Sequence, residues 1–285
     1  MKYIFKLSDN MKSIFNKSII HIFIEKCNQI ICLLFLTIVI YGCNNTPVTN
    51  NPPSATSDVN KRLLEIFVNT RCTVCPPADH YADNVNNLAG ITLNDTNVII
   101  IRYHTTLYSG DPFFDFNPVD NLARQILYNA GTSNPRAYLM SKFLSVFNSS
   151  AWTDSINSSL STSANSVDIK LYNNFNSLTS SGNIISKFKS SLTLDTDSLK
   201  YFIILTENNI AYNAPNGITV FNNVMRDIFT NPNGNEITLP VSVEVEQSLN
   251  YAVDSQINTM NSYINVFVQD ITTREVYGIT RIKLN

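Results

Sequence analysis

The sequence is poor in residues on which several common active sites depend. It has 8 glycines and 3 histidines in 285 residues. It contains neither a phosphate-binding loop nor a glycine-rich nucleotide fingerprint, and no Ser-His-Asp constellation can be recognised. Asp111 and Asp115 lack the full spacing of a calcium loop. We therefore expect no cofactor, and enzymatic activity has to be argued from other residues.

Excess positive charge is also missing. The whole chain has 20 Lys+Arg and 22 Asp+Glu, and residues 1–42 hold five of the former and two of the latter. The remainder therefore has 15 basic and 20 acidic residues, a net charge of −5. Nucleic acid is excluded as an expected partner, because phosphate binding on that scale needs a basic surface.

The N-terminal region lacks an apolar run long enough to cross a bilayer. Residues 30–41 carry no charge but fall short of the ~20 apolar residues that a span needs. They fit the ~7–15 residue apolar region of a secretory signal, and the ending Gly42-Cys43 resembles a bacterial lipobox. We expect a lipoprotein signal peptide over 1–42, a lipid on Cys43, and a flexible Asn/Pro/Thr/Ser-rich tether over 43–60. An ordinary signal peptide with a chance cysteine is the alternative.

Cysteine is scarce as well. Of five cysteines, two precede Cys43, so only Cys72 and Cys75 remain beyond the tether. One intramolecular pair with no stray thiol suits an oxidising compartment. The pair stands in Cys72-Thr-Val-Cys75-Pro76, between a strand pattern and a helix pattern. This is how a thioredoxin-like fold presents a redox-active thiol pair.

The first half alternates strand and helix patterns. Asn117 and Pro118 can begin a helix whose apolar stripe would face the core, and Gly131 would end it. Strands that alternate with helices predict a parallel core with right-handed crossovers, over 61–165. The expected strands cover 63–68, 98–101 and 136–140, the helices lie near 78–88, 118–130 and 152–160, and the stripe is Val119, Leu122, Ala123, Ile126, Leu127 and Ala130.

The second half changes to successive strand patterns. In 184–194 the apolar residues Ile184 and Phe188 share one face and Lys187 and Lys189 the other, as in a sheet with one wet face. An all-β, immunoglobulin-like sandwich over 166–285 is the expected fold. The expected strands are 167–172, 184–194, 201–206, 237–245, 263–268 and 275–284.

An ordered set of motifs resembles the Omp28-related family of lipoproteins. The set is Leu64-Glu65-x-Phe67, Cys72-x-x-Cys75-Pro76, Tyr103-His104-Thr105, Asn134-Pro135, Leu205-Thr206-Glu207-Asn208-Asn209-Ile210, Val224-Met225-Arg226 and Phe267-Val268-Gln269-Asp270. The resemblance implies a thioredoxin-like domain followed by a β-sandwich, in a lipid-anchored protein of the cell envelope, at the outer membrane. It also implies that Pro135 is a cis-proline packed against the cysteine pair. Val68-Asn69 departs from the Thr-Gly that is usual in the family, so the loop before the motif is expected to differ.

Three roles are open for the cysteine pair. As a catalyst, Cys72 would be the exposed nucleophile, favoured as thiolate by the helix start and by Arg71, and Cys75 the resolving thiol. As a structural disulfide, the bond would close a short loop and stabilise by only roughly 2 kcal/mol. A zinc site would need about four ligands, and beyond the tether only His80 and His104 could add to the pair.

The other candidate residues have ordinary structural explanations. His104 follows a buried strand pattern and fits a satisfied core histidine better than a catalyst, and His80 fits a solvated helix face. The aromatic residues Tyr108, Phe113, Phe114 and Phe116 could line a groove beside the cysteines or pin a long loop by packing.

Two functions follow. One is an envelope lipoprotein with thiol-disulfide exchange activity toward envelope proteins. The alternative is a non-catalytic surface lipoprotein with a structural disulfide, which binds a protein or glycan.

Overall fold

The computed structural model describes residues 54–55, 61–87, 97–162, 165–194 and 197–285. The predicted signal peptide, Cys43 and most of the tether lie outside these residues. In the described part of the chain, no helix is long and apolar enough to span a membrane.

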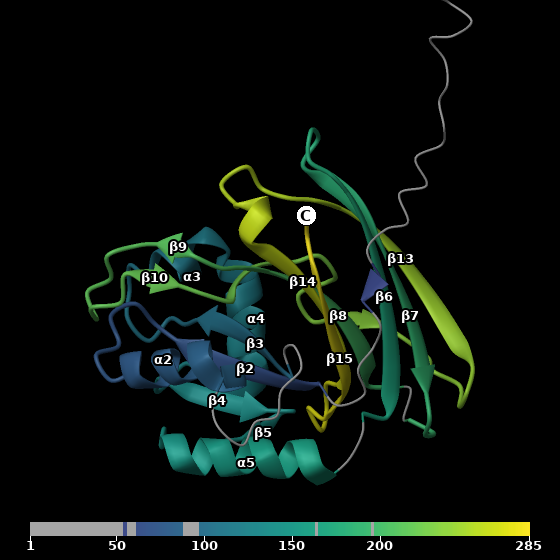
Figure 1. Ribbon diagram of the computed structural model, residues 1–285, viewed down its shortest axis with the longest axis horizontal. Coiled ribbons are helices and arrows are strands. Elements are labelled where there is room, and N and C mark those ends of the chain that lie inside the picture. Colours follow the sequence, from purple (N-terminus) through teal and green to yellow (C-terminus); the bar gives the residue numbers. More distant parts are fainter. Residues whose placement is uncertain (1–53, 56–60, 88–96, 163–164, 195–196) are drawn as a thin grey trace, which may run out of the picture. The chain divides into compact units, whose positions relative to one another are not determined.

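The described residues between 54 and 162 supply four helices and five strands, with a short 3₁₀ turn (Figure 1). The three strand patterns expected here are confirmed, although the second strand runs three residues further than predicted. The elements are β1 Ser54–Ala55, β2 Arg62–Val68, α2 Pro76–Asn84, η1 Val85–Asn87, β3 Val98–His104, α3 Pro112–Phe116, α4 Pro118–Tyr128, β4 Arg136–Leu139, β5 Lys142–Phe143 and α5 Ser149–Thr162.

Residues 165–285 are almost entirely strand and turn. The strand predicted over 237–245 is wrong: β12 ends at Glu236, β13 begins at Glu244, and Leu239 between them is buried without belonging to a strand. The elements are β6 Val167–Asn176, β7 Ser181–Ser190, β8 Leu199–Glu207, β9 Ile210–Ala211, β10 Val220–Phe221, β11 Val224–Ile228, β12 Asn235–Glu236, β13 Glu244–Ala252, η2 Thr259–Asn261, β14 Ser262–Asp270 and β15 Val276–Lys283.

Strands from both halves belong to one sheet. Nine strands form a mixed sheet in the order β15-β14-β8-β11-β3-β2-β4-β5, with β12 also paired to β8. The joint is β11, which runs parallel to β3 and antiparallel to β8. The predicted fold, an α/β thioredoxin-like domain followed by a separate immunoglobulin-like sandwich, is therefore wrong. The predicted boundary near residue 165 falls between α5 and β6, within a chain whose main sheet continues across it.

A second sheet covers part of the first. It has the order β1-β6-β7-β13 and packs over β8, β14 and β15 through an apolar core that includes Ile169, Phe188 and Ile203. At Gly278 the backbones approach so closely that an added Cβ would lie 2.2 Å from the carbonyl oxygen of Val167. Glycine is needed there because any side chain would separate the two sheets.

Strand β2 is buried on both faces and separates two cores. Leu64, Ile66 and Val68 face one cluster, which contains both Cys72 and Cys75. Leu63 and Phe67 face another, which also contains Phe202, Met225 and Phe267 from the second half. The first core is built from residues of the first half alone, whereas the second joins the two halves.

Helix α4 reverses the predicted burial. The apolar stripe that was expected to face the core is partly turned to solvent, with Val119 65% and Ile126 68% exposed. The polar face is the buried one, and it holds Asp120, Asn121, Arg124, Gln125 and Tyr128. The reason is a set of polar partners on the sheet, which a pattern of hydrophobicity does not reveal.

Candidate functional site around the disulfide

The cysteine pair lies on the loop that leads from β2 into α2. Asn69 fixes this loop: its Nδ2 donates to the carbonyl oxygens of Thr105 (2.8 Å) and Tyr108 (2.9 Å), and its Oδ1 accepts from Arg71 N (2.9 Å). Thr70 N donates to Asp111 Oδ2 at 2.8 Å. The asparagine at the position where the family usually has glycine is thus a side-chain anchor for the turn.

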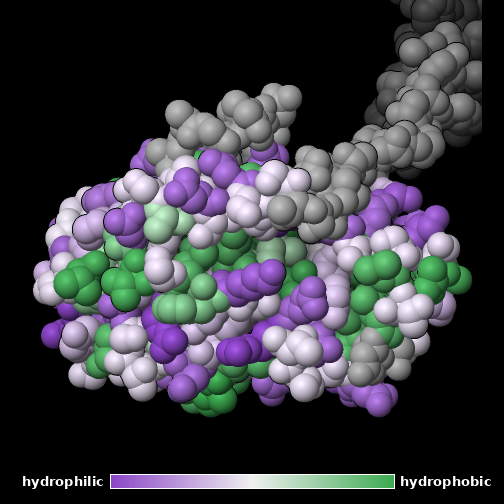
Figure 2. All heavy atoms as spheres, turned by 90° about the horizontal axis from the view of Figure 1, so that it is seen from below, coloured by the Kyte–Doolittle hydropathy of each residue, from purple (hydrophilic) through white to green (hydrophobic). Residues whose placement is uncertain are grey.

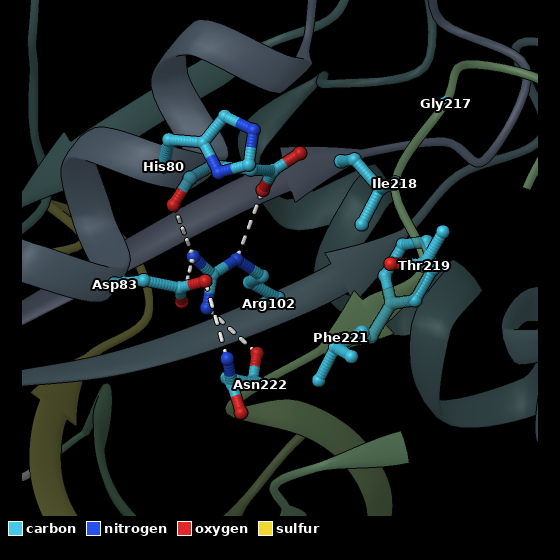
Figure 3. Close-up of a pocket in the computed structure, with 10 residues that line it drawn as sticks. His80, Asp83, Arg102, Gly217, Ile218, Thr219, Phe221 and Asn222 are labelled. Atoms are coloured by element: carbon cyan, nitrogen blue, oxygen red, sulfur yellow. Dashed lines mark hydrogen bonds and ion pairs between the residues drawn. The ribbon is translucent and has the colours of Figure 1, made fainter. Parts of the chain in front are cut away.

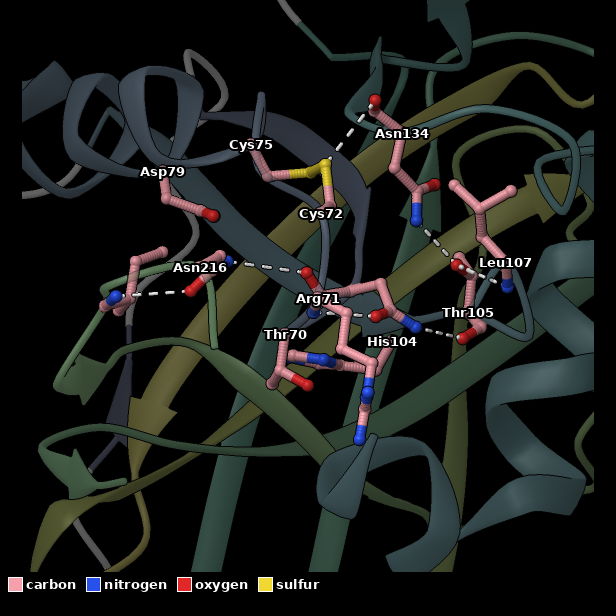
Figure 4. The surroundings of a disulfide bond; sticks show 12 residues. Thr70, Arg71, Cys72, Cys75, Asp79, His104, Thr105, Leu107, Asn134 and Asn216 are labelled. Carbon is pink, nitrogen blue, oxygen red and sulfur yellow. Dashed lines mark hydrogen bonds between the residues drawn. A yellow bond between two sulfur atoms is a disulfide. The ribbon is translucent and has the colours of Figure 1, made fainter. Parts of the chain in front are cut away.

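Cys72 and Cys75 form a disulfide, with Cα atoms 5.4 Å apart (Figure 4). Cys75 is the N-cap of α2, and its carbonyl oxygen accepts from the N–H groups of Ala78 (3.0 Å) and Asp79 (3.1 Å). Pro76 begins the helix without an N–H, which costs nothing at that position. The helix start therefore places one sulfur against the first turn of α2.

The segment Asn134–Pro135 lies beside the disulfide. The Asn134 carbonyl oxygen is 3.6 Å from Cys72 Sγ, and the peptide bond between Asn134 and Pro135 is cis. The Asn134 side chain is held in place, because its Nδ2 donates to Thr105 Oγ1 at 2.6 Å. The structure thus brings together the three residues that the sequence selected, Cys72, Cys75 and Pro135, with Pro135 in the segment next to Cys72.

The disulfide is closed to solvent. Cys72 is 2% exposed and Cys75 is fully buried, in a cluster with Ala78, Trp152 and other apolar side chains. The two residues between the cysteines face outward, and Val74 is 65% exposed. Exchange requires an attacking thiolate to reach a sulfur atom, and this arrangement leaves it little access.

The two histidines do not meet at the cysteines. His104 is buried, and its Nδ1 lies 2.8 Å from Asp111 Oδ2. Burial opposes ionisation of Asp111, but His104 and the backbone N–H groups of Thr70 and Phe113 outweigh it, so the pKa of Asp111 is lowered. His104 is therefore a paired core histidine that fixes the connection after β3.

His80 lies on α2 and lines a polar pocket of about 230 Å³ together with Asp83, Arg102 and the β9–β10 segment (Figure 3). The Arg102 guanidinium is already engaged: Nε is 2.9 Å from Asp79 Oδ1, Nη2 is 2.7 Å from Asp83 Oδ1, and Nη1 donates to the Asn222 carbonyl oxygen at 2.6 Å. Burial raises the pKa of Asp79 in spite of Arg102. With its cation neutralised, the pocket offers little to a charged ligand.

The aromatic cluster mainly packs the loop. Phe113 is buried in a small core with Phe221, and the Phe116 ring lies 3.7 Å from the Arg226 guanidinium. Asp111 caps α3 by accepting from Phe113 N (3.0 Å), which accounts for one of the two aspartates considered for calcium. Within the described ranges, no three His, Cys, Asp or Glu side chains gather to hold a metal ion.

Sequence reasoning missed a buried polar network on the opposite face of β2. Glu65 pairs with Arg124 and accepts from the Tyr128 hydroxyl, and Arg124 Nη1 also donates to Gln269 Oε1 of β14 at 3.0 Å. The Arg124 guanidinium lies among the rings of Tyr103, Tyr128, Phe202 and Phe267. A glutamate within a fully buried strand pattern was the available signal, since such a charge requires a partner.

The surface seen from below, where α5 lies in Figure 1, mixes hydrophobic, weakly polar and hydrophilic residues (Figure 2). Its hydrophobic groups are separated by hydrophilic ones. Among the described residues that this view shows, no single broad apolar patch stands out.

No family model matches the chain, and neither does any curated protein. Solved structures do: HBP35 of Porphyromonas gingivalis is 14% identical, with a TM-score of 0.68 over 81% of this chain and 76% of that chain. A domain of the outer membrane lipoprotein Omp28 from Porphyromonas gingivalis is 21% identical, with a TM-score of 0.32 over 42% of this chain and 89% of that chain. The second similarity is too low to support an argument. In fold, this chain is similar to HBP35.

Proposed function

We propose that this chain is a non-catalytic lipoprotein of the bacterial cell envelope, related to the Omp28 family, in which the disulfide is a structural clamp and the function is binding. The motif set of the sequence supports the relationship. The observation on which the proposal rests is the burial of both cysteines, 2% and 0% exposed.

The disulfide lies in a loop that is hydrogen-bonded to neighbouring segments. Cys72 N donates to the Asn69 carbonyl oxygen (3.0 Å), and Asn216 N, from the turn after β9, donates to the Thr70 carbonyl oxygen (3.1 Å). The disulfide therefore stabilises the junction at which β2, α2 and the β9–β10 segment meet. A bond with this role has to stay oxidised, and burial favours that.

Thiol-disulfide exchange is the rival function, and one feature favours it. Cys75 stands at the start of α2, where the helix dipole stabilises a thiolate. Trapping separates the two functions: Cys75→Ser would leave Cys72 to hold mixed disulfides with its substrates. Our proposal predicts no trapped envelope proteins above the level of a Cys72→Ser/Cys75→Ser control, and reproducible adducts that depend on Cys72 would overturn it.

Membrane attachment through Cys43 is a separate part of the proposal. The lipobox-like ending and the tether support it, and stable anchoring takes more than one acyl chain, as a lipoprotein has. Cys43→Ser should move the protein from the membrane fraction to the soluble fraction. Retention of that variant on membranes after a high-salt wash would contradict the anchor but would leave the structural role of the disulfide untouched.

A further inference from the structure

A small basic pocket lies where the end of β15 approaches the beginning of β2. It has a volume of about 280 Å³ and is lined by residues that include Lys61, Ile99, Asn208, Tyr263, Arg281 and Lys283. Three of these are cationic, and none of the described residues that line the pocket is a carboxylate. Arg281 and Lys283 share one face of β15, and the cross-strand partner of Lys283 is Tyr263.

Arg281, which is partly exposed, differs from three buried arginines of this fold. Arg102, Arg124 and Arg226 each lie against a carboxylate. In the described part of the chain Arg281 has no such partner: Nη2 donates to Asn223 Oδ1 at 3.1 Å, the guanidinium lies 3.8 Å from the Tyr263 ring, and Nε has no hydrogen-bond partner.

The charge on Arg281 is costly where it stands. Burial lowers its pKa to about 10, with a small opposing contribution from Tyr263, so the guanidinium remains charged at neutral pH. A cation withdrawn from water without a counter-charge destabilises a protein unless some group compensates it. An anion bound in the pocket would provide that compensation.

We propose that this pocket binds an anionic phosphate group. Tyr263 covers one face of the guanidinium and Nη2 already donates to Asn223, so Nη1 and the second hydrogen of Nη2 form the edge that can donate to phosphate oxygens in the fork geometry that arginine favours. Lys283 is exposed and adds a mobile charge at the rim. The volume admits a phosphate group with a few further atoms and no large ligand.

Two sources of phosphate fit this chemistry, a lipid headgroup and a free phosphate or phosphomonoester. The headgroup is considered because an acylated Cys43, as proposed above, would hold the chain at a membrane surface. That source alone depends on the lipid anchor proposed above. The pocket itself does not.

The test measures binding of inorganic phosphate to the full chain carrying Cys43→Ser, by calorimetry at low ionic strength. Saturable binding is expected. Arg281→Gln should abolish it and Lys283→Gln should weaken it about tenfold, the size of one lost charge-assisted hydrogen bond. Lys189→Gln is the matched control, an exposed lysine of β7 away from the pocket, and it should bind like the parent.

Variants of the partly buried Arg281 need a check on folding, so Arg281→Lys is included to retain the charge without the fork. If Arg281→Gln does not fold, the phosphate affinities of Lys283→Gln and Arg281→Lys decide whether the pocket binds phosphate. Absence of saturable phosphate binding would overturn the proposal, as would an equal loss in Lys189→Gln.

Sedimentation with vesicles then identifies the source. A lipid headgroup would be assigned as the ligand if the protein binds phosphatidylglycerol vesicles, does not bind phosphatidylcholine vesicles, and is displaced by free phosphate. Phosphate binding without vesicle binding would support the pocket and assign it to a free anion. Vesicle binding that Arg281→Gln and Lys283→Gln leave unchanged would contradict the site.

Discussion

Over residues 63–68, the two faces of β2 differ in that one buries apolar side chains alone, whereas the other buries a glutamate among Leu63 and Phe67. On one face, Leu64, Ile66 and Val68 pack in an apolar core around the disulfide. On the other, Glu65 is paired with Arg124, and that pair reaches Gln269 in the second half. The disulfide therefore lies in a core of the first half, and its loop meets the second half only through the β9–β10 segment, whereas Arg124 links the buried Glu65 directly to Gln269 in the shared sheet. A covalent bond need not be the strongest determinant of a fold.

The largest effect should come from Arg124→Met, which removes the ion-pair partner of the buried Glu65. Removing one member of a buried pair costs roughly 3–5 kcal/mol. The measurement is urea unfolding followed by Trp152, the single tryptophan, which lies in the core on the disulfide side. Because the halves share a sheet, we expect the Trp152 signal and far-ultraviolet circular dichroism to shift together.

One result would contradict this part of the comparison. An unchanged Trp152 midpoint beside a lowered dichroism midpoint would show that the halves unfold separately. A double variant Glu65→Leu/Arg124→Met is the control, because replacing a whole buried pair by apolar side chains is often neutral. It should recover much of the stability lost by Arg124→Met.

A smaller loss should follow removal of the disulfide. Cys72→Ala/Cys75→Ala opens a ring of four residues, for which loop entropy predicts about 2 kcal/mol. The free energy of unfolding from urea titration should fall by that amount, with the dichroism spectrum unchanged. A loss larger than that of Arg124→Met would reverse the ranking of the two faces.

The charged side of the sheet should also respond to pH. Burial first, and Asp120 nearby second, raise the pKa of Asp227 from 3.8 to about 6. A group whose pKa is higher in the folded state contributes stability below its unfolded pKa, and that contribution is lost as pH rises through about 6. Between pH 3.8 and about 6, the melting temperature should therefore fall by more in the parent than in Asp227→Asn. Parallel profiles for the two proteins would exclude this carboxyl as the cause.

The smallest effect is expected on the outer face of α4. Ile126 is 68% exposed, so Ile126→Ser should change the free energy of unfolding by less than about 0.5 kcal/mol. Ile126 is two residues from Arg124 on the same helix, so Ile126→Ser is a local control for Arg124→Met. A loss of several kcal/mol on urea titration would mean that this face is covered in the folded protein.

Local pattern was enough to predict most strands and the disulfide segment. The run 98–101 and the spacing of Cys72 and Cys75 depend on near neighbours in the chain, and both lie where the pattern places them. The shared sheet was not predictable, because it depends on β11 pairing with β3 through contacts more than a hundred residues apart. The burial of α4 was predicted backwards for the same reason, since Glu65 and Gln269 determine which face of that helix turns inward.

The most direct test of the structural role of the disulfide is its reduction potential. The pair would be equilibrated with thiol buffers of defined potential and its redox state read by alkylation and mass. We predict a value below about −300 mV, as for structural disulfides, and no reduction by glutathione. A potential in the range of about −120 to −270 mV, with rapid alkylation of Cys72 after reduction, would contradict the account and identify an exchange catalyst.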